Sequence, residues 1–262
     1  MDTLVETLPA PAPLLVDAAI KTRVKRQTAP QLERFYSPNN KYELSIDEAG
    51  RGTLFGRVYI ACVVLPKDPK LFSGKDIKDS KKFTSKTKLN DAAEYIKTNA
   101  LAWHIAHVES NVVDDVNILQ AVMQGMHECI RETMGRINSD VNDYPCPMTD
   151  FIAVIDGNYF NPYRAFDPTC QTIRELHHVT VEKGDGKYMA IAAASILAKS
   201  ERDKYMLELC TKYPILVERY GMDTNMGYGT KIHLAGIQKY GITQWHRRTF
   251  GCCKSANITV VS

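Results

Sequence analysis

The sequence has few of the features that mark a membrane, secreted or disulfide-bonded protein. No apolar run reaches the roughly 18 residues that a membrane-spanning helix needs. The N-terminus carries Asp2 and Glu6 and lacks the basic-then-apolar form of a secretory signal. The seven cysteines stand at scattered spacings without a Cys-x-x-Cys pair, which favours free thiols over disulfides or a zinc site. We therefore expect a cytoplasmic protein in a reducing compartment, with no membrane association.

Two common nucleotide-binding motifs are missing as well. Gly50, Gly52 and Gly56 have the wrong spacing for a dinucleotide fingerprint. Neither of the two Gly-Lys pairs in the chain is followed by the Ser or Thr of a P-loop. These absences argue against a dehydrogenase or an NTPase.

The chain is long enough for one full hydrophobic core, with 262 residues of which 44% are hydrophobic and 24% charged. Early prolines and a closing turn predict a disordered extension over residues 1–40. Its basic cluster Lys21–Arg26 fits either a nucleic-acid arm or a chance group of charges. We expect one catalytic domain over residues 41–253, followed by a short tail, residues 254–262.

Positive charge is concentrated in two segments, although the net charge is only +3. Gly74–Lys88 holds six lysines, and Gly227–Lys254 holds five basic residues, four interleaved aromatic residues and no acid. Basic residues mixed with aromatic ones suggest a track for a polyanion. A charged segment can equally be a solvated face, so both interpretations stay open.

Strands and helices alternate along the chain. An apolar residue at every second position of 42–47 predicts a strand with one buried face, whereas continuous apolar runs predict buried strands. Predicted strands lie at 42–47, 58–65, 101–108 and 151–155; predicted helices lie at 84–98, from 110 or 111 to 136, and at 187–210, with a loop at 135–150. This order predicts an α/β fold.

Three carboxylates lie where predicted strands end. Asp47 and Glu48 come directly before a turn, Gly50-Arg51-Gly52, and Asp156 closes the strand at 151–155. Glycines there let backbone N–H groups approach a ligand. Paired acids beside such a turn suit a divalent metal on one side and a phosphate or sugar on the other. The alternative is a charged surface turn.

A fourth acid, Asp203, lies in the apolar stripe of the helix at 187–210. Burying an acid without a partner is costly, so a cation shared with the three strand-end acids explains its position. The alternative is a simple ion pair with Lys199 or Arg202.

Ordered motifs now resemble a known family. They are Asp47-Glu48-Ala49-Gly50-Arg51-Gly52, Asp79-Ser80-Lys81-Lys82, Asn117-Ile118-Leu119, Ile155-Asp156-Gly157, Lys183-Gly184-Asp185, Ala192–Lys199 with Arg202-Asp203, and Gly227-Tyr228-Gly229-Thr230 with His246–Phe250. Together they resemble ribonuclease HII, a type 2 ribonuclease H, over about residues 42–252. The Gly-Arg-Gly form resembles the HII branch rather than HIII, and the last block resembles bacterial members.

This resemblance implies a ribonuclease H-like fold, with a central mixed β-sheet flanked by helices and a helical C-terminal region. It also implies an endonuclease that hydrolyses the RNA strand of RNA/DNA hybrids and incises duplex DNA at embedded ribonucleotides, leaving 5′-phosphate and 3′-hydroxyl ends. The four acids, Asp47, Glu48, Asp156 and Asp203, would then hold two Mg²⁺ or Mn²⁺ ions.

Substrate contacts follow from the same resemblance. Gly50, Arg51, Gly52 and Tyr228 would read the 2′-hydroxyl, which is the mark of a ribonucleotide. Lys81, Lys82 and Lys183 would hold phosphates, unless they are merely solvated. His246-Arg247-Arg248 would touch the backbone of the DNA strand. We assign no chemistry to Asp185, His178, His233 or His246.

Two other classes of function remain. One is a different metal-dependent nuclease or integrase of the same superfamily, which would ignore the 2′-hydroxyl. The other is a non-catalytic module that binds hybrids. We expect a monomer, and the end of the chain carries no recognisable sliding-clamp motif.

Overall fold

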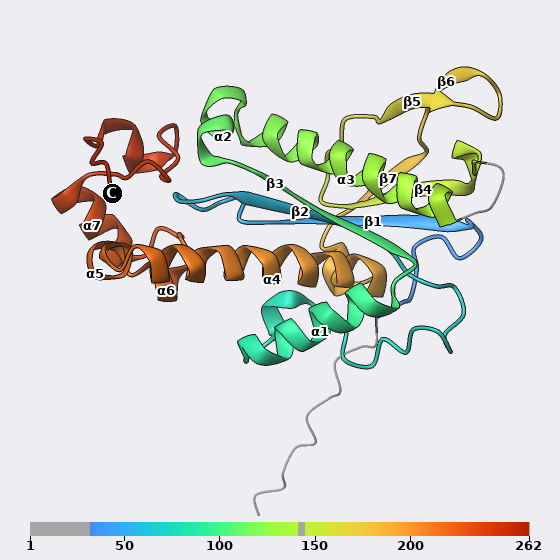
Figure 1. Ribbon diagram of the computed structural model, residues 1–262, viewed down its shortest axis with the longest axis horizontal. Helices are drawn as coiled ribbons and strands as arrows, with labels where there is room; N and C mark the ends of the chain where they lie inside the picture. Colours follow the sequence, from blue (N-terminus) through green and yellow to red (C-terminus); the bar gives the residue numbers. More distant parts are fainter. Residues whose placement is uncertain (1–31, 141–144, 262) are drawn as a thin grey trace, which may run out of the picture. The chain divides into compact units, whose positions relative to one another are not determined.

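A five-stranded mixed sheet forms the centre of the computed structural model, which describes residues 32–140 and 145–261 (Figure 1). The strand order is β3-β2-β1-β4-β7. β1 pairs with β2 antiparallel and with β4 parallel, so the sheet is mixed as predicted. The strands are β1 Tyr42–Ala49, β2 Val58–Val64, β3 Ala102–Val108, β4 Phe151–Asp156 and β7 His178–Val181, and β5 Arg164–Asp167 pairs with β6 Thr172–Glu175 in a separate hairpin.

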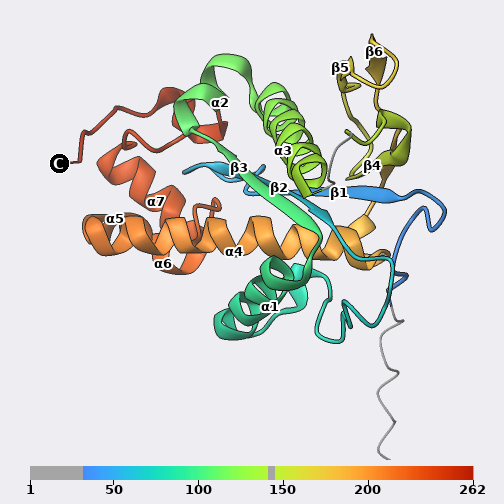
Figure 2. The ribbon, with the colours of Figure 1, turned by 45° about the vertical axis from the view of Figure 1, so that its right-hand side comes forward.

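Helices cover both faces of this sheet (Figures 1 and 2). α3 (Ile118–Asp140) packs on one face, against β2 and β3, while α4 (Met189–Lys212) packs on the other, with α1 (Lys86–Asn99) beside it. The prediction of one buried face for β1 was therefore wrong. Its polar residues are buried too, because the alanines of α4 let the helix approach closely. Glu43 is compensated there by backbone N–H groups from residues 36 and 37.

Helix boundaries differ from the predicted ones at three places. The long helix predicted from 110 is broken at Asn117, whose φ of +66° separates α2 (Ser110–Val116) from α3. The Asn117 side chain then accepts hydrogen bonds from the first N–H groups of α3. α3 continues to residue 140, into the stretch predicted as a loop. Ser85 rather than Thr84 caps α1.

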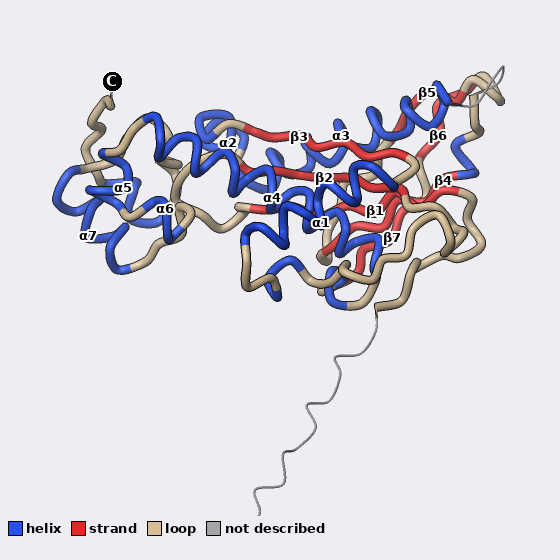
Figure 3. Tube along the Cα trace, turned by 60° about the horizontal axis from the view of Figure 1, so that its bottom comes forward, coloured by secondary structure: helices blue, strands red, loops and turns tan. Residues whose placement is uncertain are grey.

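The C-terminal region is helical, as predicted (Figure 3). It contains α5 (Ile215–Tyr220), α6 (Met222–Asn225), α7 (Lys231–Tyr240) and the short η4 (Gly251–Ser255). These elements and the end of α4 surround their own apolar cluster, which includes Phe55 from the loop between β1 and β2. The last residues are held to it by a bridge between Ile242 and Ile258. The β1–β2 loop is thus anchored on the C-terminal region.

Residues 32–40 belong to the folded unit, which corrects the extension predicted over 1–40. Glu33 exchanges backbone hydrogen bonds with Lys187 and Met189, and the Arg34 guanidinium donates to the Phe72 carbonyl at 2.8 Å. Residues 1–31, with the basic cluster Lys21–Arg26, lie outside the described residues. None of the described helices combines the length and apolar character needed to cross a bilayer. All seven cysteines are free thiols, as predicted.

Candidate active site

Strand pairing brings two of the predicted acids together. β1 and β4 run parallel with Ile46 opposite Ile155, so the next residues, Asp47 and Asp156, lie side by side near the carboxyl ends of the strands. Asp185, in the short helix η3 (Gly184–Gly186), joins them. One carboxylate oxygen from each of these three acids lies within 4.8 Å of the other two. We call Asp47, Asp156 and Asp185 the acid trio.

Hydrogen bonds fix the acid trio. The Asp156 carboxylate accepts the N–H of Gly184 at 2.6 Å, and Asp47 accepts the N–H of Glu48 at 2.7 Å. The Lys81 ammonium donates to Asp185 at 3.1 Å. Lys81 lies in η1 (Ser80–Lys82). The hydroxyl groups of Ser80 and of Ser195 in α4 share a hydrogen bond of 2.9 Å. Each carboxylate therefore has a defined orientation.

Burial makes Asp47, Glu48 and Asp156 costly to ionise. Burial raises the pKa of Asp47 well above its ordinary value, and the charges of Asp156 and Glu48 raise it further. Burial likewise raises the pKa of Asp156 and of Glu48, the latter opposed by the Arg51 guanidinium 3.2 Å away. The site thus concentrates more negative charge than the neighbouring cations offset.

All four predicted carboxylates line one pocket of about 440 Å³. Five other predicted site residues also line this pocket: Gly50, Arg51, Gly52, Tyr228 and Lys81. Two predicted lysines do not line it: Lys82 points to Asp79, with 3.9 Å between the charged atoms, and Lys183 forms the left-handed turn before η3. Tyr228 is half exposed at the rim.

Asp203 lines the pocket but lies outside the acid trio. Its carboxylate accepts two hydrogen bonds from the Lys199 ammonium, at 2.9 and 3.1 Å, one helical turn back on α4. The ion pair foreseen as the alternative is therefore present. The ion pair is compatible with the other interpretation, a cation shared with the strand-end acids, because Lys199 and Asp203 both line the pocket and Lys199 is about one third exposed.

Arg247 does not touch solvent, which overturns its predicted contact with a DNA backbone. It is fully buried, and its guanidinium donates to the carbonyls of Arg51, Thr53 and Gly56 at 2.9–3.1 Å. His246 is buried as well, and its ring bonds the ring of His233 at 3.0 Å. These residues hold the Gly50–Gly56 loop in place.

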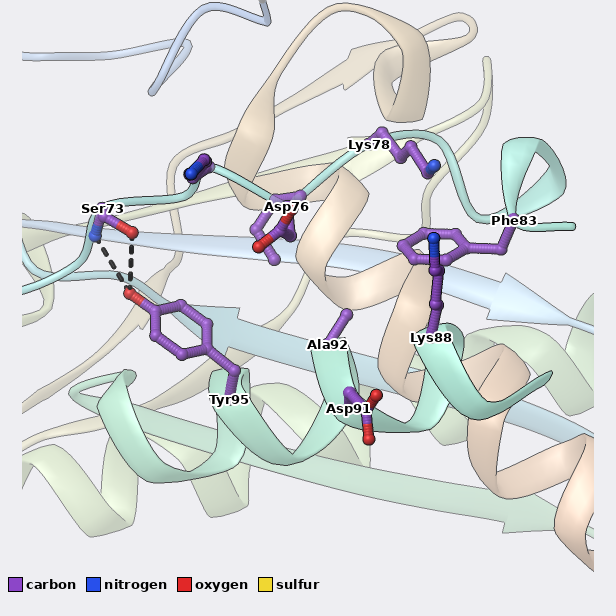
Figure 4. A pocket seen from close by; sticks show the side chains of 10 residues that line it. Ser73, Asp76, Lys78, Phe83, Lys88, Asp91, Ala92 and Tyr95 are labelled. Atoms are coloured by element: carbon purple, nitrogen blue, oxygen red, sulfur yellow. Dashed lines mark hydrogen bonds between the residues drawn. The ribbon is translucent and has the colours of Figure 1, made fainter. Parts of the chain in front are cut away.

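Three of the six lysines of the first basic segment line a second hollow (Figure 4). This hollow, of about 460 Å³, lies between the loop at 73–83 and α1, and Lys75, Lys78 and Lys88 line it together with Asp76 and Asp91. The Lys78 ammonium lies 4.6 Å from the centre of the Phe83 ring. The role predicted for this segment as a polyanion track stays a prediction.

Comparison with known proteins decides the family. A family model described as ribonuclease HII matches residues 44–253. The chain belongs to the ribonuclease HII family. It is 39% identical to the ribonuclease HII of Parabacteroides distasonis over 215 residues, which cover 82% of this chain and 92% of that relative. The predicted resemblance to ribonuclease HII and its bacterial members is confirmed.

Solved structures confirm the fold. The chain matches the ribonuclease HII of a PCNA complex from Archaeoglobus fulgidus with a TM-score of 0.55 and 24% identity, over 80% of this chain and 95% of that one. It matches Bst-RNase HIII in complex with Mn²⁺ with a TM-score of 0.51 and 15% identity, over 76% of this chain and 63% of that one. The α/β fold of ribonuclease HII is therefore present.

Sequence reasoning missed four residues of the pocket and its support. Asp185 stood in a quoted motif, where only Lys183 received a role, although an acid after a Gly was the available signal. Lys199 and Arg202 were named only as partners for Asp203. For Arg247, no local signal distinguishes a buried arginine from an exposed one, because its acceptors are carbonyls more than 190 residues away.

Proposed function

We propose that the acidic pocket hydrolyses the RNA strand of RNA/DNA hybrids and incises duplex DNA at embedded ribonucleotides, leaving 5′-phosphate and 3′-hydroxyl ends. The observation that carries this proposal is the acid trio, with oxygens within 4.8 Å of one another, two of whose members, Asp47 and Asp156, line a pocket together with the Gly50-Arg51-Gly52 turn and Tyr228. Membership of the ribonuclease HII family supports the substrate class.

The donors of the pocket fit divalent cations. Every candidate ligand is a carboxylate oxygen, which is the ligand type that Mg²⁺ and Mn²⁺ prefer. The raised pKa values of Asp47, Glu48 and Asp156 mean that a nearby positive charge would stabilise their ionised forms. Two such ions, when bound, would activate a water and stabilise the leaving 3′-oxygen in an in-line displacement.

We propose that the acid trio, Asp47, Asp156 and Asp185, holds the metal together with Glu48, and that Asp203, the fourth predicted ligand, contributes from the facing side of the pocket. Asp47 and Asp156 are fixed by the sheet, so their positions need little reorganisation. Asp203 can turn toward an ion if Lys199, which is partly exposed, moves away into solvent. Asp185 also orients Lys81 toward the pocket.

Selectivity for ribose would come from the glycine turn and Tyr228. A side chain at Gly52 would meet no protein atom within 4 Å, so the backbone there is open to a ligand. We propose that Gly50, Arg51 and Gly52 present backbone groups to the 2′-hydroxyl, and that half-exposed Tyr228 contacts the next sugar. Lys81 lines the pocket and is the best placed of the three lysines to hold a phosphate. For Lys82 and Lys183, which do not line the pocket, we propose that they hold phosphates just outside it.

Several broader proposals accompany the activity. We propose that one catalytic domain spans the chain from Leu32 through residue 253, that the protein acts in the cytoplasm as a monomer, and that it uses Mg²⁺ or Mn²⁺. The structurally similar ribonuclease HII of Archaeoglobus fulgidus was solved with PCNA. For this chain, the lack of a sliding-clamp partner stays a prediction.

A substrate comparison tests the proposed function. Three labelled duplexes are incubated with Mg²⁺, Mn²⁺ or a chelator: an RNA/DNA hybrid, a DNA duplex with one ribonucleotide, and an all-DNA duplex. We expect cleavage of the first two only, dependent on metal, with 3′ ends that a DNA polymerase extends. Equal cutting of the all-DNA duplex would favour a nuclease that ignores the 2′-hydroxyl. Binding of the hybrid without cleavage would favour a non-catalytic module.

A further inference from the structure

Arg202 lies between the two loops that form the proposed ribose reader. One loop carries Gly50 and the other carries Tyr228, and 178 positions separate them in the sequence. The Arg202 guanidinium donates to the Met226 carbonyl at 2.7 Å, two residues before Tyr228. Its central carbon lies 5.9 Å from the centre of the Tyr228 ring. Arg202 thus touches the second loop at its backbone and at its aromatic side chain.

Arg202 also fills the space next to Gly50. A side-chain carbon at Gly50 would come within 2.1 Å of the Arg202 Nε atom. The φ of +88° at Gly50 is a second reason for glycine, so this residue is required both for backbone geometry and for contact with Arg202. The guanidinium therefore packs directly against the glycine turn.

Within residues 32–140 and 145–261, the Arg202 guanidinium forms no ion pair. Only 3% of Arg202 is exposed, and its Nε atom has no hydrogen-bond partner among the described residues. The neighbouring carboxylate, Asp203, is taken by Lys199. Because the side chain is almost fully buried, the charged guanidinium is held there against a desolvation cost. A residue needed only to fill the volume would be apolar.

We infer that Arg202 is a positioning residue that sets the distance between the Gly50 turn and the Tyr228 ring, and thereby determines selectivity for ribose. This inference rests on the proposed function. The cation over the ring fixes Tyr228 at the rim, and the bond to Met226 fixes the loop that carries it. The bare backbone of Gly50 then lies against the other side of the same guanidinium.

A double-mutant cycle between Arg202 and Tyr228 tests this inference. The variants Arg202→Met, Tyr228→Ala and their combination are assayed for kcat/KM on a DNA duplex with one ribonucleotide, at a temperature where circular dichroism shows each to be folded. If Arg202 acts through Tyr228, each single change costs roughly tenfold and the combination costs at most about twofold more than the worse single change. Independent, multiplying losses would overturn the positioning role.

Arg57 provides a matched control. The Arg57 guanidinium lies 4.5 Å from the ring centre of Tyr205, a residue of α4. Arg57 does not line the pocket. Arg57→Met removes an arginine–aromatic contact of the same kind, together with the ion pair between Arg57 and Glu109, and its effect is expected to multiply independently with that of Tyr228→Ala. A loss of additivity with Arg57→Met as well would mean that the cycle reports general destabilisation.

A conservative variant keeps the test decisive if Arg202→Met does not fold. Arg202→Lys retains the charge and can reach a carbonyl, but it lacks the planar fork that packs on Gly50. We expect it to restore the melting temperature more fully than it restores kcat/KM. Full recovery of both would overturn the inference. If Tyr228→Ala has no effect in the wild-type background, the proposed ribose reader itself fails, and this outcome is distinct from additivity with Arg202.

Discussion

Charge is buried in two neighbouring regions of this protein, and the two are built in opposite ways. At the end of the sheet, the acid trio gathers three carboxylates, and burial raises the pKa of two of them, Asp47 and Asp156. Beneath the Gly50–Gly56 loop, the buried guanidinium of Arg247 donates to three backbone carbonyls. The first region holds charge that needs an added cation, and the second uses charge to support a loop.

The difference distinguishes buried charged residues that serve the reaction from buried charged residues that stabilise the fold. A buried group that donates to several acceptors, as Arg247 does from Nε and Nη1 though not from Nη2, contributes to stability, whereas buried like charges reduce it. Removing a charge should therefore have opposite effects on stability in the two regions, and the following predictions use that contrast.

The largest expected effect is on activity in the acid trio. Asp47→Asn should lower kcat by on the order of a thousandfold or more, because a ligand of the reacting ions is lost. In chelator the same variant should melt at a higher temperature than the wild type, because one of the repelling buried charges is gone. Gel-based cleavage and differential scanning fluorimetry measure the two effects. The exposed acid Asp115 gives the control, since Asp115→Asn should change neither.

The next largest effect is on stability beneath the loop. Arg247→Met should lower the free energy of unfolding by about 3–5 kcal/mol, because three buried carbonyls lose their donor. Its neighbour Arg248 is exposed, so Arg248→Met should stay within about 0.5 kcal/mol. Urea denaturation of the two variants measures the contrast. Equal losses would show that Arg247 is not the support of the loop.

Metal should stabilise the protein in a pH-dependent manner. The pKa values of Asp47, Glu48 and Asp156 are raised in the folded state, so the folded protein binds more protons than the unfolded chain between the ordinary and the raised values. Without metal, these acids lower stability as pH rises through that window, and the cost is absent below it. Added Mg²⁺ should therefore raise the melting temperature more at pH 8 than at pH 5.

The size of this metal effect follows from mass action. At a metal concentration a hundred times the Kd, binding to the folded state adds about 2.7 kcal/mol. Melting curves in Mg²⁺ and in chelator at both pH values provide the measurement. A stabilisation that is equal at the two pH values would contradict the assignment of the raised pKa values to the metal ligands.

The smallest expected effect concerns Lys199. Its ammonium donates two hydrogen bonds to the Asp203 carboxylate. Lys199→Gln should therefore free that carboxylate and tighten Mn²⁺ binding by roughly threefold. Titration calorimetry measures the change. Weaker binding in this variant would mean that Lys199 orients Asp203 for the metal instead of competing with it.

Local patterns sufficed for part of the fold and of the site. Asp47 closes an alternating segment and Asp156 closes a continuous apolar run, so their positions near strand ends could be read from neighbouring residues. The break at Asn117 could not, because both flanking segments have helical spacing and only the backbone angle shows the interruption.

Burial of polar residues was the harder part to predict. Glu43 and Asp47 alternate with apolar residues, which indicated an exposed face, yet α4 covers that face. Coverage of this kind depends on an element about 150 positions further along the chain. For the same reason, the roles of Arg202 and Arg247 became visible only from contacts with the Gly50–Gly56 loop.

The most direct test of the central claim is a binding titration of Mn²⁺, followed by electron paramagnetic resonance, on the wild type, Asp47→Asn and the control Asp115→Asn. If buried acids gather at the sheet end to hold divalent ions, the wild type and the control should bind Mn²⁺ saturably and Asp47→Asn should bind at least about tenfold more weakly. Equal binding by all three proteins, with Asp47→Asn folded, would contradict the account.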